Sequence, residues 1–411
     1  MSTPTPPSVL LGREAMMATY SPPNLAFESG RGVWLHGNDG KDYLDFYSGI
    51  AVSAFGHNHP YLVKALQEAS EKVWHLSNMF RIPQAERLAT RLCEQSFATK
   101  VFFTNSGAES NECGLKAIRK YQAVKAEAAG HNCVKNRIIG FSSAFHGRTI
   151  ATVGAGGNPA HMKGFLMEDE GFDQVPYGDL AALEAAITEQ TAGVILEPVQ
   201  GEGGIRPADE AFFRGVRRLC DEHDILMMVD EVQCGMGRTG KLFAHQWYGV
   251  EPDIMSLAKG IGGGFPLGAC LANDKAAAAM VFGTHGSTYG GNPLATAIGN
   301  AVLDLLSEEG FLESVQSRAA YLQEKLAGLI ARYPNVYDSV SGKGLMLGFK
   351  CVVPNGDVLV SLRDDHQMLV AKSGDNQVRM LPPLNVTEAE IDTAIDRLAA
   401  AAETLLARAE G

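Results

Sequence analysis

Short, uninterrupted apolar runs recur through the middle of this chain, and longer segments with helical spacing separate them. The runs occupy residues 101–103, 137–141, 193–196, 225–229 and 254–257. A strand with no polar alternation is typical of a sheet that is buried on both faces, and the intervening helices provide its crossovers. The sequence therefore predicts an α/β fold, built on a mostly parallel, mixed sheet that is flanked by helices.

The two ends of the chain have a different texture. Residues 32–46 predict a hairpin, because two short apolar strands flank an Asn-Asp-Gly turn. Other helices and strands are expected at 60–76, 84–95, 293–307, 312–332, 344–350, 378–381 and from Glu388 onward. A chain of 411 residues is long enough for a large core and a smaller companion. We expect an N-terminal segment that is part of a small domain, a large domain and a C-terminal small α+β domain, at 1–58, 59–293 and 294–411.

Charge and cysteine spacing exclude several classes of function. The formal net charge is −12, and an acidic surface repels phosphate backbones, so nucleic acid is not an expected partner. The seven cysteines show no Cys-x-x-Cys spacing, which argues against a disulfide framework and a structural zinc site. Residues 1–8 are proline-rich and lack a signal-peptide pattern, and no apolar run reaches the roughly 20 residues that span a bilayer. A cytoplasmic protein with no membrane partner and no bound metal is expected.

Ionisable side chains follow two of the apolar runs, where strands are expected to end. Asp230 follows residues 225–229, and Lys259 follows residues 254–257. A buried carboxylate needs a cation or a metal, and a buried lysine is either an ion-pair partner or a nucleophile. Each residue alone is more typical of a structural ion pair. Because ligands of an open α/β sheet bind at the carboxyl ends of its strands, the two residues together indicate a site.

The turn after residues 101–103 has the composition of a phosphate site. The sequence Thr104-Asn-Ser-Gly-Ala-Glu-Ser-Asn-Glu112 opens a helix, whose free N–H groups and dipole attract anions. An ordinary capped helix has the same pattern. Phe145 offers a flat face for an aromatic ring. Pyridoxal-5'-phosphate (PLP) needs an amine for its aldehyde, a carboxylate for its pyridine nitrogen, N–H donors for its phosphate and a surface for its ring. The sequence therefore predicts a PLP site.

Several motifs, in this order and spacing, resemble the class III (subgroup II) aminotransferases of the fold-type-I PLP family. The resemblance runs from about Tyr20 to the end of the chain and is weakest at residues 352–377. Within the family it is greatest to the members that act on acetylornithine. The motifs are Gly56-His-Asn-His-Pro60, His75-Leu-Ser-Asn-Met-Phe80, Asn105-Ser-Gly-Ala-Glu109, Ala144-Phe-His-Gly-Arg148, Glu197-Pro-Val-Gln-Gly-Glu-Gly-Gly204, Asp230-Glu-Val-Gln-Cys-Gly-Met-Gly-Arg-Thr-Gly240, Ala258-Lys259 and Gly286-Ser-Thr-Tyr-Gly-Gly-Asn-Pro293.

The resemblance implies how the cofactor is bound. Lys259 would hold it as a Schiff base and shuttle the proton during catalysis. Asp230 would pair with the pyridine nitrogen, Gln233 would reach the ring hydroxyl, and Phe145 would stack on the ring. The phosphate-binding set would be Ser106, Gly107 and Ala108, completed by Thr288 of the partner subunit, with Ser287 near the substrate. A homodimer with shared active sites is therefore expected. Many relatives have Thr in place of Ala108, so one hydroxyl contact is expected to be missing.

The resemblance also implies how two substrates share one site. Arg148 would bind the α-carboxylate of acetylornithine, and Arg379 would bind that of glutamate or 2-oxoglutarate. Glu202 would neutralise Arg379 while the ω-amine is bound and move aside for glutamate. Ile50 stands where ornithine aminotransferases have a tyrosine that contacts the free α-amine, and an apolar side chain there favours an acylated donor. The expected reaction transfers the δ-amino group of N2-acetyl-L-ornithine to 2-oxoglutarate, in arginine biosynthesis.

Other functions remain open at this point. Succinylornithine, succinyl-diaminopimelate, 4-aminobutyrate and ornithine are alternative donors, because most enzymes that use them share the Glu202 and Arg379 pair. An aminomutase of the glutamate-1-semialdehyde type shares the lysine and needs no keto acid, and a silent PLP-binding protein is a third class. His57 and His59 are expected to be turn residues and not metal ligands, and His146 is expected to pack beside the ring.

Overall fold

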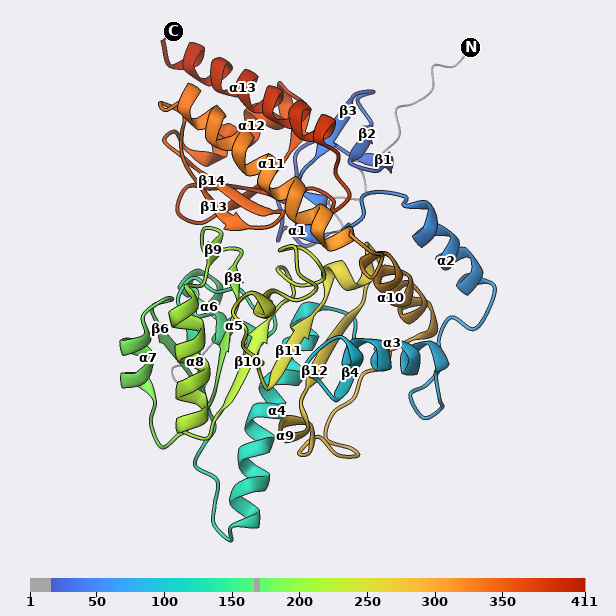
Figure 1. Cartoon of the computed structure of the whole chain (residues 1–411), viewed down its shortest axis with the longest axis vertical. Helices are drawn as coiled ribbons and strands as arrows, with labels where there is room; N and C mark the ends of the chain where they lie inside the picture. The colour runs from blue at the N-terminus through green and yellow to red at the C-terminus, as the bar shows by residue number, and fades with distance from the viewer. Residues whose placement is uncertain (1–15, 166–170, 411) are drawn as a thin grey trace.

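A large sheet of seven strands forms the centre of the chain (Figure 1). The structure, a computed structural model, describes residues 16–165 and 171–410. The strand order is β4-β12-β11-β10-β7-β5-β6, and neighbouring strands are parallel except where β12 pairs with β11 and β4. The predicted α/β fold with a mostly parallel, mixed sheet is confirmed. The strands are β4 (Lys100–Thr104), β5 (Arg137–Phe141), β6 (Phe172–Val175), β7 (Thr191–Leu196), β10 (Leu226–Asp230), β11 (Ile254–Leu257) and β12 (Gly268–Ala272).

Both faces of this sheet are buried. All six residues of β7 are buried, and their side chains alternate between two apolar cores. Val194 and Leu196 lie in a core with residues of α8 (Glu210–Glu222), and Ile195 lies in a second core with residues of α4 (Gly107–Ala128). Each aliphatic side chain so buried contributes about 1.5–3 kcal/mol. This two-sided burial explains why the strands read as uninterrupted apolar runs.

Shorter elements complete the large unit. The helices α2 and α3 pack with α10 at the β4 edge of the sheet, and α5 and α7 lie near the β6 edge (Figure 1). A small two-stranded ribbon, β8 with β9, follows β7. These elements are α2 (Pro60–Ser70), α3 (Pro83–Glu94), α5 (Ile150–Gly156), α6 (Pro159–Met162), α7 (Leu180–Ala186), β8 (Val199–Gln200), β9 (Arg206–Pro207), α9 (Asp274–Ala277) and α10 (Pro293–Leu306).

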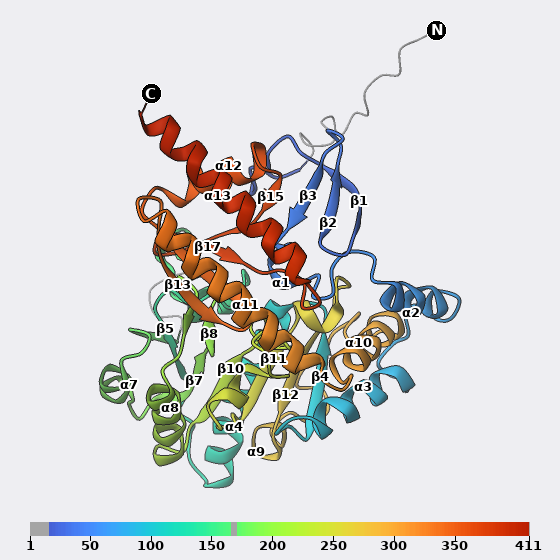
Figure 2. The same cartoon turned by 45° about the horizontal axis from the view of Figure 1, so that its top comes forward.

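Two smaller sheets bring the ends of the chain together (Figure 2). The N-terminal strand β3 pairs in parallel with β15, and the second sheet has the order β13-β14-β17-β16. We propose that domain boundaries lie after residues 58 and 293. The elements are β1 (Phe27–Arg31), β2 (Trp34–Gly37), β3 (Asp42–Asp45), α1 (Ser48–Ala51), α11 (Phe311–Arg332), β13 (Tyr337–Lys343), β14 (Met346–Cys351), α12 (Asn355–Asp364), β15 (Met368–Leu369), β16 (Ala371–Ser373), β17 (Gln377–Met380) and α13 (Glu388–Glu410).

The structure differs from the predicted elements at the end of α2 and in several elements that the sequence pattern does not predict. The helix expected at 60–76 ends at Ser70, whose carbonyl accepts a hydrogen bond from Trp74 Nε1 (2.6 Å) in place of a helical N–H. The sequence pattern also predicts neither β12 nor α12. The proline-rich segment at 1–8 lies outside the described residues. Among the helices of the described ranges, none is long and apolar enough to cross a membrane.

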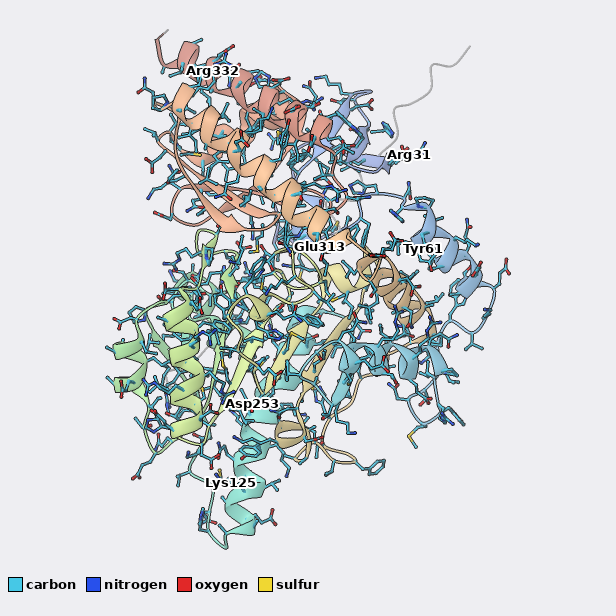
Figure 3. All side chains as sticks on the ribbon, viewed as in Figure 1. Arg31, Tyr61, Lys125, Asp253, Glu313 and Arg332 are labelled. Atoms are coloured by element: carbon cyan, nitrogen blue, oxygen red, sulfur yellow. The ribbon has the colours of Figure 1, made fainter. Side chains whose placement is uncertain are left out.

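A buried carboxylate lies at the amino end of the strands, away from the C-terminal helices. It belongs to Asp253, which precedes β11 and is labelled in Figure 3. Its Oδ2 accepts hydrogen bonds from Arg217 (2.8 Å) and the Met227 N–H (2.9 Å), and its Oδ1 accepts one from Asn273 (2.9 Å). The Asp253 carboxylate is fully occupied by these partners, so its role is structural. Ligands of an α/β sheet bind at the carboxyl ends of the strands, and the site is expected there.

Candidate active site

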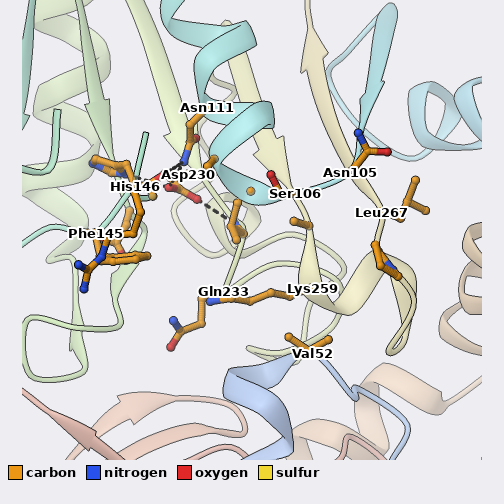
Figure 4. Close-up of a pocket in the computed structure, with 18 of the residues that line it drawn as sticks. Val52, Asn105, Ser106, Asn111, Phe145, His146, Asp230, Gln233, Lys259 and Leu267 are labelled. Carbon is orange, nitrogen blue, oxygen red and sulfur yellow. Dashed lines mark hydrogen bonds and ion pairs between the residues drawn. The ribbon is translucent and has the colours of Figure 1, made fainter. Parts of the chain in front are cut away.

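A cavity of about 430 Å³ lies at the carboxyl ends of the central strands (Figure 4). The turn before α4, the loop after β5 and the segments after β10 and β11 form its wall. Glu202, Arg379, Ser287 and Thr288 are not among the described residues of this wall. Most of the predicted site residues are, namely Ser106, Gly107, Ala108, Phe145, Arg148, Asp230, Gln233 and Lys259.

Asp230 is the last residue of β10, and its carboxylate is buried in the cavity wall. Its Oδ2 accepts hydrogen bonds from Asn111 Nδ2 (2.7 Å) and His146 Nδ1 (2.8 Å), and its Oδ1 accepts one from the Val232 N–H (2.9 Å). Ser256 Oγ donates to Asn111 Oδ1 (2.5 Å), which turns the Asn111 amide N–H toward the carboxylate. Within the described ranges, no lysine or arginine pairs with Asp230. A buried carboxylate placed in this way suits a cationic ring nitrogen.

His146 has a larger part in the site than the packing that the sequence predicts. Its ring is buried, and its Nδ1 bonds Asp230, while its Nε2 has no partner in the part of the chain that the structure describes. Burial opposes protonation of this ring, but the hydrogen bond and the charge of Asp230 outweigh burial and raise the pKa of His146. Asn111 and Ser256 were not predicted as site residues, and His146 was predicted only to pack beside the ring. The available signal was a polar residue inside an apolar run, as Ser256 is in β11.

Lys259 follows β11 in a strained backbone conformation. Its φ is 50°, in the left-handed region that non-glycine residues seldom adopt. Its side chain lines the cavity and makes no hydrogen bond or ion pair with another described residue. Burial, together with the nearby charge of Arg379, lowers the pKa of Lys259 to about 8. The neutral amine is therefore populated near neutral pH, as a nucleophilic lysine requires.

Helix α4 begins at the cavity with Ser106 as its N-cap residue. Ser106 Oγ accepts a hydrogen bond from the Glu109 N–H (3.2 Å), and Glu109 Oε2 accepts one from the N–H of Asn105, the residue before the cap (2.6 Å). Gly107 and Ala108 occupy the first turn of the helix, where an N–H group has no intrahelical acceptor, and both residues line the cavity. The turn is thus an ordinary capped helix start and also presents free donors that a phosphate would accept.

Glu197 joins two loops of the cavity wall, and it was not predicted as a site residue. Its Oε1 accepts a hydrogen bond from the Phe145 N–H (3.1 Å), and its Oε2 accepts one from the Gly201 N–H (3.1 Å). Burial raises the pKa of Glu197 to about 7. Phe145 lines the cavity, and the Arg148 guanidinium lies 5.7 Å from the centre of its ring. Glu197 therefore fixes the backbone of the residue expected to stack on the cofactor.

Arg379 and Glu202 form an ion pair beside the cavity. Arg379 Nη2 donates to Glu202 Oε1 (2.8 Å), and its Nη1 donates to Gln233 Oε1 (2.7 Å). The Arg379 side chain is 1% exposed and the Glu202 side chain is 37% exposed. One member of the pair is thus fixed, and the other has room to move. Since Gln233 bonds Arg379 through its oxygen, its amide N–H group remains as a donor in the cavity wall.

Three of the remaining sequence expectations concern residues outside the cavity wall. Ser287 Oγ accepts hydrogen bonds from the Gly290 N–H (2.9 Å) and from Asn105 Nδ2 (3.4 Å), so it lies next to the phosphate-type turn. Thr288 is exposed on the surface. Ile50 is half-buried against a separate apolar cluster, and Val52 is the residue of its segment that lines the cavity. Ile50 is thus outside the cavity wall, and its position beside the donor stays a prediction.

The two histidines considered as metal ligands lie in the turn before α2. His57 Nε2 bonds Asp45 Oδ2 (2.7 Å), and His59 is the residue before the first turn of the helix. Within the ranges 16–165 and 171–410, no group of three or more His, Cys, Asp or Glu side chains is placed to hold a metal ion.

The residues that line the cavity fit PLP. Lys259 offers a buried amine without a hydrogen-bond partner among the described residues, and Asp230 offers a buried carboxylate without a basic partner other than His146. The first turn of α4 offers N–H donors, and Phe145 offers an aromatic surface. These groups match the aldehyde, ring nitrogen, phosphate and ring of that cofactor.

Comparisons with known proteins agree with this chemistry. The acetylornithine aminotransferase of Brucella melitensis is 55% identical over 390 residues, which cover 93% of this chain and 95% of that protein. The succinylornithine transaminase of Yersinia enterocolitica is 42% identical over the full length of both chains. The crystal structure of N-acetylornithine aminotransferase from Stenotrophomonas maltophilia has a TM-score of 0.83 at 36% identity, covering 97% of this chain and 99% of that one. The family described as aminotransferase class-III matches residues 15–402, and the chain belongs to that family of PLP-dependent enzymes.

Proposed function

We propose that this enzyme transfers the δ-amino group of N2-acetyl-L-ornithine to 2-oxoglutarate, giving N-acetyl-L-glutamate 5-semialdehyde and L-glutamate. The observation that carries the proposal is the Glu202–Arg379 pair at 2.8 Å beside the cavity that contains Lys259. A movable carboxylate on a fixed, buried arginine suits an enzyme that binds an ω-amine in one half-reaction and an α-amino dicarboxylate in the other.

The chain's own groups would hold and use the cofactor as follows. PLP, when bound, supplies a ring that accepts electrons from the substrate bond being broken. Asp230 would keep the ring nitrogen protonated, and Asn111 with His146 would hold the Asp230 carboxylate in place. Gly107 and Ala108 would bind the phosphate through their N–H groups. Lys259 Nζ would attach to the aldehyde carbon and, once displaced by substrate, would carry the proton from the reacting carbon.

Two arginines would bind the carboxylates of the two substrates. Arg148 lies at the cavity wall above Phe145 and would bind the α-carboxylate of the acylated donor. Arg379 would bind the α-carboxylate of glutamate or 2-oxoglutarate after the Glu202 carboxylate leaves it. While the ω-amine is bound, Glu202 would neutralise Arg379, because an uncompensated guanidinium would repel the incoming ammonium group.

The relatives favour acetylornithine as the donor. Seven relatives named for acetylornithine, that of Brucella melitensis among them, are 47–55% identical to this chain, and the Yersinia enterocolitica relative named for succinylornithine is 42% identical. Succinylornithine is the second candidate on that ground. An acetylornithine donor would place the enzyme in arginine biosynthesis, and we expect the enzyme to act in the cytoplasm.

We propose that the enzyme acts as a homodimer with shared sites. Thr288 is exposed, and Asn78 Nδ2 fixes its loop by bonding the carbonyls of Ser287 (3.0 Å) and Gly290 (3.1 Å). The segment around Asn78 and the loop that contains Thr288 also carry exposed apolar side chains, which supports a surface for a partner subunit there. They are those of Trp74, Met79, Phe80 and Tyr289.

The test is a screen of half-reactions with the PLP-loaded enzyme. Acetylornithine, succinylornithine, ornithine and 4-aminobutyrate are added one at a time without keto acid, and loss of the cofactor's visible absorption is followed. We expect the highest kcat/KM with acetylornithine. Faster reaction with 4-aminobutyrate or succinylornithine would overturn the choice of donor. Formation of a rearranged product without any keto acid would show an aminomutase instead.

A further inference from the structure

We propose that Ser373 is a positioning residue that sets the enzyme's preference between the ω-amine donor and the α-amino dicarboxylate. It would act through Glu202, by holding the main chain on which that carboxylate turns. The inference rests on the proposed function, because it concerns the use that the two substrates make of the Glu202–Arg379 pair. Ser373 is buried at the end of β16, outside the cavity wall.

Ser373 bonds the main chain on both sides of Glu202. Its Oγ donates to the carbonyl of Gly201 (2.9 Å) and accepts from the N–H of Gly204 (3.1 Å). The next residue, Gly374, donates its N–H to the carbonyl of Glu202 itself (2.9 Å). One hydroxyl and one peptide group of the C-terminal unit therefore fix the main chain around Glu202.

The loop that contains Glu202 is also held from its other side, by Glu197. Glu197 Oε2 accepts the Gly201 N–H at 3.1 Å. There is also little space for the loop to shift as a whole. A Cβ on Gly201 would lie 2.5 Å from Gln233 Oε1, and a Cβ on Gly374 would lie 2.9 Å from the carbonyl oxygen of Glu202. Movement of the Glu202 carboxylate away from Arg379 is therefore a rotation of the side chain about a fixed main chain.

The same hairpin carries both sides of this arrangement. Strand β16 pairs with β17, with Ser373 opposite Gln377 and Ala371 opposite Arg379. Asn355 Nδ2 bonds the carbonyls of Ser373 (3.1 Å) and Gln377 (2.9 Å), which closes the hairpin end. The hairpin of β16 and β17 therefore holds both the Arg379 side chain and the main chain of Glu202. A loss at Ser373 changes the position of the carboxylate relative to the arginine without removing either group.

Loss of the Ser373 hydrogen bonds is expected to affect the two substrates differently. A loosened main chain weakens the pairing of Glu202 with Arg379, so the ω-amine meets a less neutralised guanidinium. The α-carboxylate of glutamate has to displace Glu202, so the same change leaves its binding unaltered or improves it. Loss of a hydrogen bond that leaves buried partners unsatisfied amounts to about tenfold in an equilibrium or rate.

The experiment compares half-reactions of the PLP-loaded Ser373→Ala variant with acetylornithine and with L-glutamate. We expect kcat/KM for acetylornithine to fall about tenfold while that for glutamate stays within about twofold of wild type or rises. The matched control is Ser361→Ala, because Ser361 Oγ is also buried and has no partner among the described residues. Its ratio of the two kcat/KM values should equal that of wild type.

A double-mutant cycle separates positioning from a general structural effect. In a Glu202→Ala background the serine has no carboxylate to position, so Ser373→Ala should leave the ratio unchanged. The role of Ser373 would be overturned if Ser373→Ala caused equal losses with both substrates. It would also be overturned if Ser361→Ala shifted the ratio, or if Ser373→Ala shifted the ratio in the Glu202→Ala background. If wild type does not react with acetylornithine but reacts with ornithine or 4-aminobutyrate, the proposed donor fails and that ω-amine replaces it in the ratio. Reaction with no ω-amine would overturn both.

Discussion

Burial shifts the pKa values of two ionisable groups of the cavity in opposite directions, and both shifts favour the uncharged form. It lowers the pKa of Lys259 to about 8 and raises the pKa of Glu197 to about 7. Both shifts have the same origin, because a charged group loses hydration when it is buried. A lysine thereby releases its proton more readily, and a carboxyl group retains its proton. Near neutral pH the lysine is thus ready to exchange the proton that transamination has to move.

The pKa of Lys259 predicts how the PLP-free protein captures its cofactor. Only the neutral amine attacks an aldehyde, so the rate of attachment should rise with pH, with a midpoint at about 8, and level off above it. Between about 8 and the ordinary lysine value of 10.5 the unfolded chain holds more protons, so the free energy of unfolding of the PLP-free protein should also rise there with pH. Stopped-flow absorbance of PLP binding measures the first effect. A midpoint near 10.5 would contradict it.

The two arginines predict a crossed pattern of kinetic losses. Arg148→Ala should raise KM for acetylornithine by about tenfold or more, since a charge-assisted bond of about 1.5–3 kcal/mol is lost, and should change KM for glutamate much less. Half-reaction kinetics with each substrate measure the split. The control is Arg332→Ala, an exposed residue far from the cavity at the outer end of α11 (Figure 3). Equal increases in KM for both substrates would show that the arginine roles are wrongly assigned.

At the scale of the element, the strand that ends with Asp230 and the strand that precedes Lys259 could be predicted from the sequence. Their two-sided burial produces the apolar run, and the charge that ends each run marks the sheet edge. Strand β12 could not be predicted in this way, because its residues Gly268 to Ala272 are mostly small and it enters the sheet against the direction of its neighbours. The end of α2 at Ser70 was also missed, since it depends on a side-chain bond from Trp74.

The contacts of the groups that support the site could not be predicted from the sequence, although Ser256 stands out as a polar residue inside an apolar run. Asn111 and His146 bond Asp230 from separate segments of the chain, Ser256 bonds Asn111, and only the folded sheet brings these groups together. Glu197 likewise bonds the Phe145 N–H across two loops. Sequence patterns indicate which groups react, because those groups follow apolar runs. They do not indicate which polar groups hold them, because that depends on tertiary contacts.

The antiparallel pairing of β12 with β4 predicts an effect at the phosphate-type turn. Gly268 lies opposite Thr104 in the strand register, and a Cβ there would come within 2.4 Å of Thr104 Oγ1 and 2.8 Å of the Ser106 carbonyl. Gly268→Ala should therefore lower the free energy of unfolding by about 1–3 kcal/mol and weaken PLP binding by displacing the turn. Chemical unfolding and PLP titration measure both.

A matched glycine distinguishes this crowding from a general effect of adding a methyl group. Gly328 is exposed in α11, and a Cβ there would have nothing within 4 Å. Gly328→Ala should raise the free energy of unfolding by about 0.5–1 kcal/mol and leave PLP binding unchanged. Unaltered PLP affinity in Gly268→Ala would mean that the turn does not depend on the contact between β12 and β4.

At the scale of the whole molecule, the site is assembled where the large unit meets the C-terminal unit. The buried Arg238 connects the two, because its Nη1 donates to the carbonyls of Leu345 (3.1 Å) and Pro382 (2.6 Å) while its own carbonyl accepts the Leu345 N–H (3.0 Å). Burial lowers the pKa of Arg238 to about 9, and no described carboxylate pairs with it. The segment that begins with Asp230 is thus bonded to the residues that follow Arg379.

The proposed homodimer predicts that two inactive variants restore each other. If Thr288 of the partner subunit binds the cofactor phosphate, Thr288→Asp inactivates both sites of its own dimer by charge repulsion, and Lys259→Ala inactivates both sites of its own dimer by removing the amine. A heterodimer of these two variants, isolated by two different affinity tags, has a site that combines the intact lysine of one chain with the intact threonine of the other. Its activity should be about half that of wild type, because a two-fold dimer has two equivalent sites. If Thr288 instead serves its own chain, neither site of the heterodimer is complete, and no activity should return.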